Sequence, residues 1–212
     1  MKRVTATLVT DGSSDRLLAP LIELLFSAHT ELAYQVNCAE GLPPVSGGLQ
    51  ARIDSALELF PCDLLFIHRD AEGIEANIRQ QEIEEAWKQS QKTAVLVCVV
   101  PVRMTEAWLI ANEGPIRSAV GNPNGTAPLA LPAVKDIESS PEPKEILFAA
   151  LKAASGLNAS RKRRFKPHQF RHRVSDLTDD LTALRKLSSF RHLEAQVRKY
   201  FAVSMSGSGA AR

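Results

Sequence analysis

Apolar and polar positions follow a strand-like pattern in four short stretches of the N-terminal half of the chain. Residues 3–10 alternate between apolar and polar side chains and are rich in β-branched residues, which favours a strand. Residues 33–38 form a shorter candidate strand. Residues 63–68 and 93–100 are almost continuous apolar runs, the pattern of strands that are buried on both faces of a sheet. The pattern therefore predicts four strands.

Helical periodicity occupies the intervals between these strands. Residues 16–28 and 49–60 place apolar side chains on one helical stripe, and residues 74–90 form a charged helical stretch. A further helix covers residues 105–112, with Thr105 as its candidate N-cap. The alternation of strands and helices predicts an α/β fold, with a mostly parallel, Rossmann-like sheet flanked by helices.

The second half of the chain is less regular. Residues 114–143 are rich in Pro, Gly, Asn and Ser and have little periodicity, which indicates a loop-rich excursion. Helices are predicted at residues 143–154 and, as a pair, within residues 166–201. The expected organisation is an α/β core at 1–113, the excursion at 114–143, a helical basic region at 144–203 and a flexible Gly/Ser-rich tail at 204–212.

Acidic residues follow three of the predicted strands. Asp11 comes after the first strand, Asp70 and Glu72 after the third, and Glu106 after the fourth. Because ligands of parallel sheets bind beyond the carboxyl ends of the strands, we expect these carboxylates to share one edge. Asp15, one helical turn beyond Asp11, is a further candidate. Taken singly, each acid also fits a turn, a helix cap or a charge near a helix N-terminus.

Clustered carboxylates raise one another's pKa unless a cation neutralises them. Oxygen ligands with few His or Cys companions suit Mg²⁺ or Mn²⁺. Such an ion polarises phosphate oxygens and activates water for attack at phosphorus. The joint placement of the acids therefore predicts a metal site. His68, beside Arg69 at a strand end, is interpreted as a structural, hydrogen-bonded residue, with metal ligation or proton transfer as alternatives.

The net charge of +2 conceals two halves of opposite sign. Residues 1–150 hold 12 Lys or Arg and 20 Asp or Glu, whereas residues 151–212 hold 14 Lys or Arg and 4 Asp or Glu. An acidic body with a basic C-terminal part indicates a polyanion partner, a cation site, or both.

Basic residues are densest in residues 161–173, which contain no acid. Such a run makes salt-dependent, largely sequence-independent contacts to phosphates. Phe165 and Phe170 within it either stack on bases or anchor the segment to the core. The alternative is a solvated charged face, or a segment that neutralises the acidic body of its own or another subunit. The predicted nucleic-acid contacts are Arg161, Lys162, Arg163, Arg164, Lys166, Arg171 and Arg173.

Several classes of protein are disfavoured by missing motifs. The sequence has no GxxxxGK[ST], GxGxxG, GxSxG or HExxH motif, which argues against a nucleotide-hydrolysing motor, a dinucleotide dehydrogenase, an α/β-hydrolase and a zinc protease. Its three cysteines form no CxxC pair, so they are expected to be buried thiols. No apolar run reaches the ~18–20 residues of a membrane span, and no signal segment is recognised, so we expect a cytoplasmic protein.

Four short motifs resemble a known family. They read Asp11-Gly12-Ser13-Ser14-Asp15, Arg69-Asp70-Ala71-Glu72, Glu106-Ala107-Trp108-Leu109 and Ser189-Phe190-Arg191. Their order resembles TOPRIM domains, the Mg²⁺-dependent catalytic folds of topoisomerases, primases and OLD-type nucleases. The chain more closely resembles the TOPRIM-like domain of unknown function family 4276, which is common in bacteria and often lies near defence genes.

The resemblance implies a TOPRIM-like, Mg²⁺-dependent nuclease that hydrolyses phosphodiester bonds of DNA or RNA in bacterial or phage defence. A separately encoded ATPase and a second copy of the chain are the protein partners to consider. In this assignment Asp11 and Glu106 are catalytic, and Asp11, Asp70, Glu72 and Glu106 hold the metal.

Two positions depart from the family pattern, because TOPRIM proteins usually carry Glu where this chain has Asp11 and Asp where it has Glu72. Each exchange keeps the charge and changes the reach by one methylene. This leaves open a catalytically silent nucleic-acid-binding or scaffold protein. A small-molecule phosphatase or nucleotide-processing enzyme that uses the same acids is a third reading.

Overall fold

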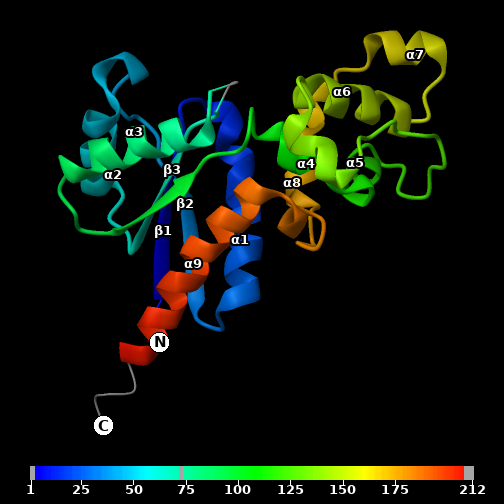
Figure 1. Cartoon of the computed structure of the whole chain (residues 1–212). Coiled ribbons are helices and arrows are strands. Elements are labelled where there is room, and N and C mark those ends of the chain that lie inside the picture. The colour runs from blue at the N-terminus through cyan, green and yellow to red at the C-terminus, as the bar shows by residue number, and fades with distance from the viewer. Residues whose placement is uncertain (1–2, 72–73, 208–212) are drawn as a thin grey trace.

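A parallel sheet lies at the centre of the computed structural model, which describes residues 3–71 and 74–207 (Figure 1). Its four strands run in the order β2-β1-β3-β4, and every neighbouring pair is parallel. The strands are β1 (Arg3–Val9), β2 (Ala33–Cys38), β3 (Leu64–His68) and β4 (Val95–Val99). The structure therefore confirms the predicted α/β fold with a parallel sheet flanked by helices.

Helices cover both faces of this sheet. Successive strand side chains point to opposite faces, and the buried residues accordingly form two clusters. Phe66 and Val97 belong to the larger cluster, which includes α1 (Leu18–His29) and α9 (Ser188–Gly207). Leu65 and Ile67 belong to the smaller one, with residues of α2 (Leu49–Leu59) and α3 (Ala76–Lys88). Every residue of β3 is buried, as its continuous apolar run predicted.

Helix α9 also covers the outer edge of β4. The side-chain amide of Gln196 accepts a hydrogen bond from the Cys98 N–H at 2.8 Å and donates one to the Cys98 carbonyl at 3.0 Å. It thus pairs with this residue of the edge strand as a neighbouring strand would.

A helical lobe lies beside the sheet (Figure 1). It contains α4 (Glu106–Leu109), α5 (Glu113–Ala119), α6 (Pro143–Ala154), α7 (Ala159–Arg164) and α8 (Arg171–Asp176). Its apolar side chains join the larger cluster; among them, Trp108 of α4 meets Phe190 of α9 edge to face at 5.2 Å. The lobe and the α1 face of the sheet therefore share one core.

The segment 114–143 holds more regular structure than predicted. Helix α5 falls largely within it, and a 3₁₀ turn covers Val134–Ser139. Ile116, Ala119 and Ile137 are fully buried in the larger cluster. Tertiary burial stabilises these short elements although their Pro- and Gly-rich surroundings give no helical periodicity.

The C-terminal region differs from the prediction at its end. The tail was predicted to begin at residue 204, but α9 continues to Gly207, and residues 208–212 lie outside the described residues. Within residues 166–187 the predicted single helix is replaced by two 3₁₀ turns, Pro167–Phe170 and Leu184–Lys186, on either side of the short α8. Over residues 3–71 and 74–207, none of the helices combines the length and apolar character that a membrane crossing needs.

Candidate functional site

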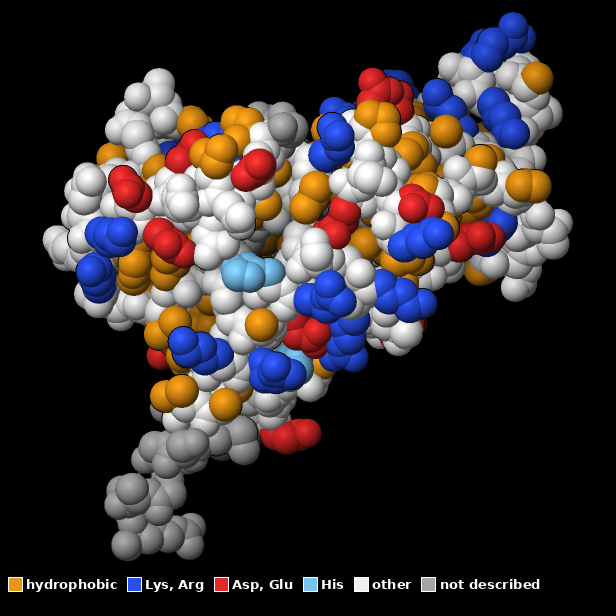
Figure 2. Space-filling view, in the orientation of Figure 1, with side chains coloured by type: hydrophobic (Ala, Val, Ile, Leu, Met, Phe, Trp, Pro, Cys, Tyr) orange, Lys and Arg blue, Asp and Glu red, His pale blue; other side chains and the backbone are white. Residues whose placement is uncertain are grey.

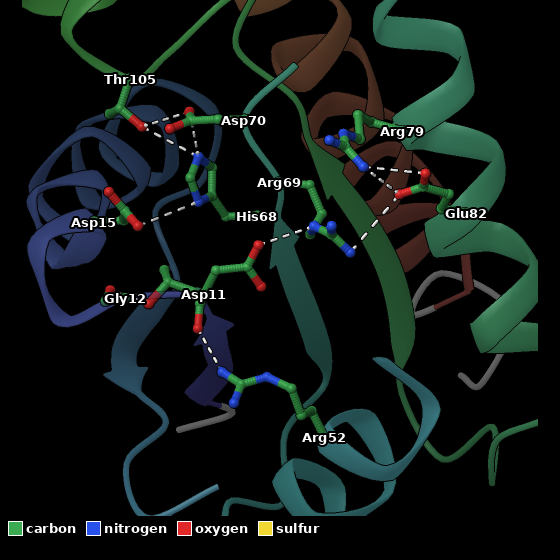
Figure 3. A network of polar contacts seen from close by, with 11 residues as sticks. Asp11, Gly12, Asp15, Arg52, His68, Arg69, Asp70, Arg79, Glu82 and Thr105 are labelled. Carbon is green, nitrogen blue, oxygen red and sulfur yellow. Dashed lines mark hydrogen bonds and ion pairs between the residues drawn. The ribbon is translucent and has the colours of Figure 1, made fainter. Parts of the chain in front are cut away.

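The candidate site lies where β1 and β3 end side by side. The chain leaves β1 for β2 on one side of the sheet, while β3 and β4 lie on the other, so this is the switch point at which parallel sheets bind ligands. A hollow of about 240 Å³ opens there. Its lining includes Asp11, Asp15, His68, Arg69, Asp70 and Arg79 (Figure 3).

His68 is the central side chain of the hollow. It ends β3, and only 2% of its surface is exposed. Its Nε2 lies 3.1 Å from Asp70 Oδ1 and 3.1 Å from Thr105 Oγ1 (Figure 3). The Thr105 hydroxyl also donates to Asp70 Oδ1 at 3.3 Å. Because an ionised carboxylate only accepts hydrogen bonds, the proton of a neutral His68 ring is assigned to Nε2, which leaves a lone pair on Nδ1.

This second ring nitrogen has no hydrogen-bond partner among the described residues, although it is buried. The nearest acid is Asp15, whose Oδ2 lies 3.9 Å from Nδ1. Burial raises the pKa of Asp15 above its ordinary value, and the charges of Asp70 and Glu106 add to the rise, while His68 and the Ser14 hydroxyl oppose it. The raised pKa of Asp15 therefore reflects mainly its burial and, to a smaller extent, the neighbouring carboxylates.

Asp11 points toward an arginine. Its Oδ2 lies 2.9 Å from Arg69 Nε, and Arg69 also approaches Glu82 of α3 at 3.7 Å. Arg79 of the same helix donates to both oxygens of Glu82, at 3.1 and 3.0 Å. A chain of alternating charges therefore links the end of β1 to α3 (Figure 3).

Glu106 is paired with another arginine. It is 5% exposed in α4, and Arg171 of α8 donates to its Oε1. Arg171 was predicted to contact nucleic acid, but this guanidinium is turned into the protein and joins two helices of the lobe. Removing either partner leaves the other charge buried without compensation.

Three of the four predicted metal ligands, Asp11, Asp70 and Glu106, follow strand ends at one edge of the sheet, and each has its own partner. Asp70 contacts His68 and Thr105. Asp11 forms an ion pair with Arg69, and Glu106 forms one with Arg171. Glu72, the fourth predicted ligand, lies outside the described residues. Within the part of the chain that the structure describes, no three His, Cys, Asp or Glu side chains are grouped as a metal ion needs. The donor chemistry suits a divalent cation, but a closed ligand set is not preformed.

Most of the predicted nucleic-acid contacts lie at the tip of the lobe. Helix α7 carries four of them, of which Arg161, Arg163 and Arg164 are exposed. Figure 2 shows basic side chains gathered at this end of the lobe. Phe165 and Phe170 stack on each other at 4.9 Å and pack against the larger apolar cluster. These rings therefore anchor the basic segment. Lys166 and Arg173 are also exposed.

Thr105 occupies the N-cap position of α4, as predicted, but its hydroxyl makes no capping hydrogen bond. The hydroxyl instead contacts His68 and Asp70, which the sequence did not indicate. His68 has the hydrogen bonds expected of it, but the sequence does not indicate that its Nδ1 lacks a hydrogen-bond partner among the described residues. Asp15, named only as a companion of Asp11, lies closer to the centre of the site than expected.

Comparisons with protein-family models, with curated proteins and with solved structures found no match.

Proposed function

We propose that this chain is a TOPRIM-like, divalent-metal-dependent nuclease that hydrolyses phosphodiester bonds of DNA or RNA. The observation that carries the proposal is the placement of Asp11, Asp15 and Asp70 around one hollow at the ends of β1 and β3. Burial raises the pKa of Asp15, and the charges of Asp70 and Glu106 raise it further. A divalent ion, Mg²⁺ or Mn²⁺, relieves such a cluster.

The acids of this edge would hold the ion. Bound there, it would polarise a phosphate oxygen and lower the pKa of a water molecule. Asp70 is already oriented by Thr105 and His68. Where Asp11 turns to the ion, Arg69 is left to pair with a phosphate oxygen, which is a charge-assisted contact that guanidinium groups make well. Glu106 and Glu72 complete the proposed ligand set.

In this proposal, the exposed arginines of α7 bind the nucleic-acid backbone together with Lys166 and Arg173. Their contacts would be to phosphates and would depend on salt concentration. The resemblance to family 4276 adds a role in bacterial or phage defence, with a separately encoded ATPase as a partner.

A second candidate function is a catalytically silent protein that binds nucleic acid or serves as a scaffold. The ion pairs of Asp11 with Arg69 and of Glu106 with Arg171 favour it, because they neutralise two of the acids without a metal ion. Such a protein would keep the basic segment and lose the need for a metal.

The test is cleavage of single- and double-stranded DNA and RNA by the purified chain with Mg²⁺ or Mn²⁺. We expect cleavage that requires the metal, is lost in Asp70→Asn and is retained in Asp179→Asn, an exposed acid outside the hollow. Binding of nucleic acid without cleavage, unchanged in Asp70→Asn, would establish the silent protein instead. Preference for short nucleotides over long chains would indicate a nucleotide-processing enzyme.

A further inference from the structure

The lone pair of His68 Nδ1 is the least explained feature of the hollow. Its ring is nearly sealed from solvent, with 2% of the residue exposed, and Nδ1 has no hydrogen-bond partner among the described residues. A buried polar atom without a hydrogen-bond partner destabilises the folded state. The ring lines the hollow, so whatever satisfies Nδ1 is expected to enter from there.

The ring is held in a fixed orientation. Nε2 lies 3.1 Å from both Asp70 Oδ1 and Thr105 Oγ1, so the imidazole is fixed by its far side while Nδ1 faces Asp15 (Figure 3). A carboxylate on one ring nitrogen is the usual companion of a histidine whose other nitrogen binds a metal, because it fixes the tautomer and raises the basicity of the ring.

The gap between Nδ1 and Asp15 Oδ2 fits one ion. Ligand atoms that bind the same first-row metal at about 2.0–2.2 Å each lie roughly 3–4 Å apart, depending on the angle between them. The two atoms here are 3.9 Å apart, and no hydrogen bond spans that distance. A cation between them would satisfy Nδ1 and neutralise the half-buried Asp15.

We infer that His68 Nδ1 and Asp15 Oδ2 are two ligands of a transition-metal position in this hollow, with Asp70 orienting the imidazole. This inference deepens the proposed function, on which it rests for the presence of an ion at this edge, and it changes two assignments. Asp15 becomes a ligand, and Asp70 becomes a positioning residue for His68. Because imidazole nitrogen binds first-row transition ions better than Mg²⁺, the position selects Mn²⁺ over Mg²⁺.

The test is binding of Mn²⁺ alone to the full chain. Calorimetry measures the affinity, and electron spin-echo spectroscopy identifies the atoms that bind the ion. His68→Gln removes Nδ1 and keeps a terminal amide that can still donate to Asp70. The matched control is His168→Gln, at an exposed histidine in the lobe. We expect the bound Mn²⁺ to show hyperfine coupling to nitrogen. This coupling should change when only the histidines of the chain are labelled with ¹⁵N. The coupling disappears in His68→Gln and persists in His168→Gln.

Affinity gives a second measure. We expect Asp70→Asn to weaken Mn²⁺ binding by about 10–100-fold, the range found when the orienting partner of a metal-bound histidine is lost. His68→Gln should weaken it at least as much. If His68→Gln does not fold, as judged by thermal unfolding, Asp15→Asn provides the test. Its expected result is weaker binding with the nitrogen coupling retained.

Mn²⁺ bound without histidine coupling would overturn the inference and leave a carboxylate metal site intact. Coupling that survives in His68→Gln would place the nitrogen ligand elsewhere and also overturn it. Absence of Mn²⁺ binding at millimolar concentration would overturn it as well. The proposed function is decided separately, by metal-dependent cleavage.

Discussion

Replacing Arg171 by Met probes the ion pair that connects the candidate site to the helical lobe. Arg171 lies on α8 and Glu106 on α4, 65 residues apart in the chain, and their side chains are 15% and 6% exposed. Met retains much of the apolar volume of the arginine stem but not its charge. The substitution therefore leaves Glu106 buried beside Asp15 with no cation.

The magnitude follows from that burial. Breaking a buried ion pair by removing one partner typically costs about 3–5 kcal/mol, whereas an exposed pair contributes only about 0–1 kcal/mol. Since Glu106 is buried and Arg171 is mostly buried, we expect Arg171→Met to lower the free energy of unfolding by about 3 kcal/mol. Combining it with Glu106→Gln removes the orphaned charge, so the double variant should be more stable than Arg171→Met alone.

Urea unfolding at neutral pH measures these differences, with Arg173→Met, an exposed position on the same helix, as the matched control. Divalent cations add a functional readout, because an acid that has lost its arginine binds Mg²⁺ or Mn²⁺ more readily. We therefore expect either ion to stabilise Arg171→Met more than the wild type. A loss below about 1 kcal/mol would refute the reasoning, since it would mean that Glu106 is solvated without its partner.

Three further predictions concern pH and salt. Because the folded-state pKa of Asp15 is raised, its ionised form destabilises the fold, so Asp15→Asn should unfold at higher urea than the wild type at pH 7, with the difference vanishing below the ordinary pKa of 3.8. Glu138 behaves oppositely: burial raises its pKa, but hydrogen bonds from Ser188 and Ser189 outweigh burial, so the net pKa is lowered. Its ionised form therefore stabilises the fold above pH 4.5, and this stabilisation is lost as the pH falls through the folded-state pKa. Glu138→Gln should therefore cost about 1–2 kcal/mol at pH 7, in urea titrations repeated down to acid pH. Changing Arg163 and Arg164 of α7 to Gln should weaken nucleic-acid binding and reduce the slope of log affinity against log salt by about 2, as measured by fluorescence anisotropy.

Each of these predictions has a clear contrary result. Equal stability of Asp15→Asn and wild type at pH 7 would mean that the charge of Asp15 costs nothing in the folded state. A pH-independent effect of Glu138→Gln would mean that its charge is not what holds the start of α9. An unchanged salt slope would exclude α7 from the contacts to phosphate.

The order of strands and helices was predictable because each has a local signal. Continuous apolar runs marked β3 and β4, and the helical stripe at residues 143–154 coincides with α6. Helix α5 was missed because its stability comes from contacts such as the burial of Ile116 and not from periodicity. Strands and helices that have a local hydrophobic pattern can be predicted from the sequence, whereas short helices without such a pattern depend on tertiary packing.

The site was predictable only in outline. Parallel topology places strand ends together, so the meeting of Asp11 and Asp70 followed from their positions after β1 and β3. Their actual partners did not follow. Thr105 approaches Asp70 from 35 residues away, and Arg171 approaches Glu106 from 65. Such pairs arise from the packing of the lobe against the sheet, for which a single sequence carries no periodic signal.

The hydrogen bonds between Gln196 and Cys98 have a consequence for how the chain folds. They join residues 98 positions apart, so the edge of β4 is sealed only after a long stretch of chain has been closed into a loop. Until α9 docks, β4 presents an open edge and the sheet face of Phe66 and Val97 is left partly uncovered. Such species associate through strand edges and apolar faces. We therefore expect refolding of this chain to compete with aggregation until α9 has docked, so that dilution raises the yield of native protein.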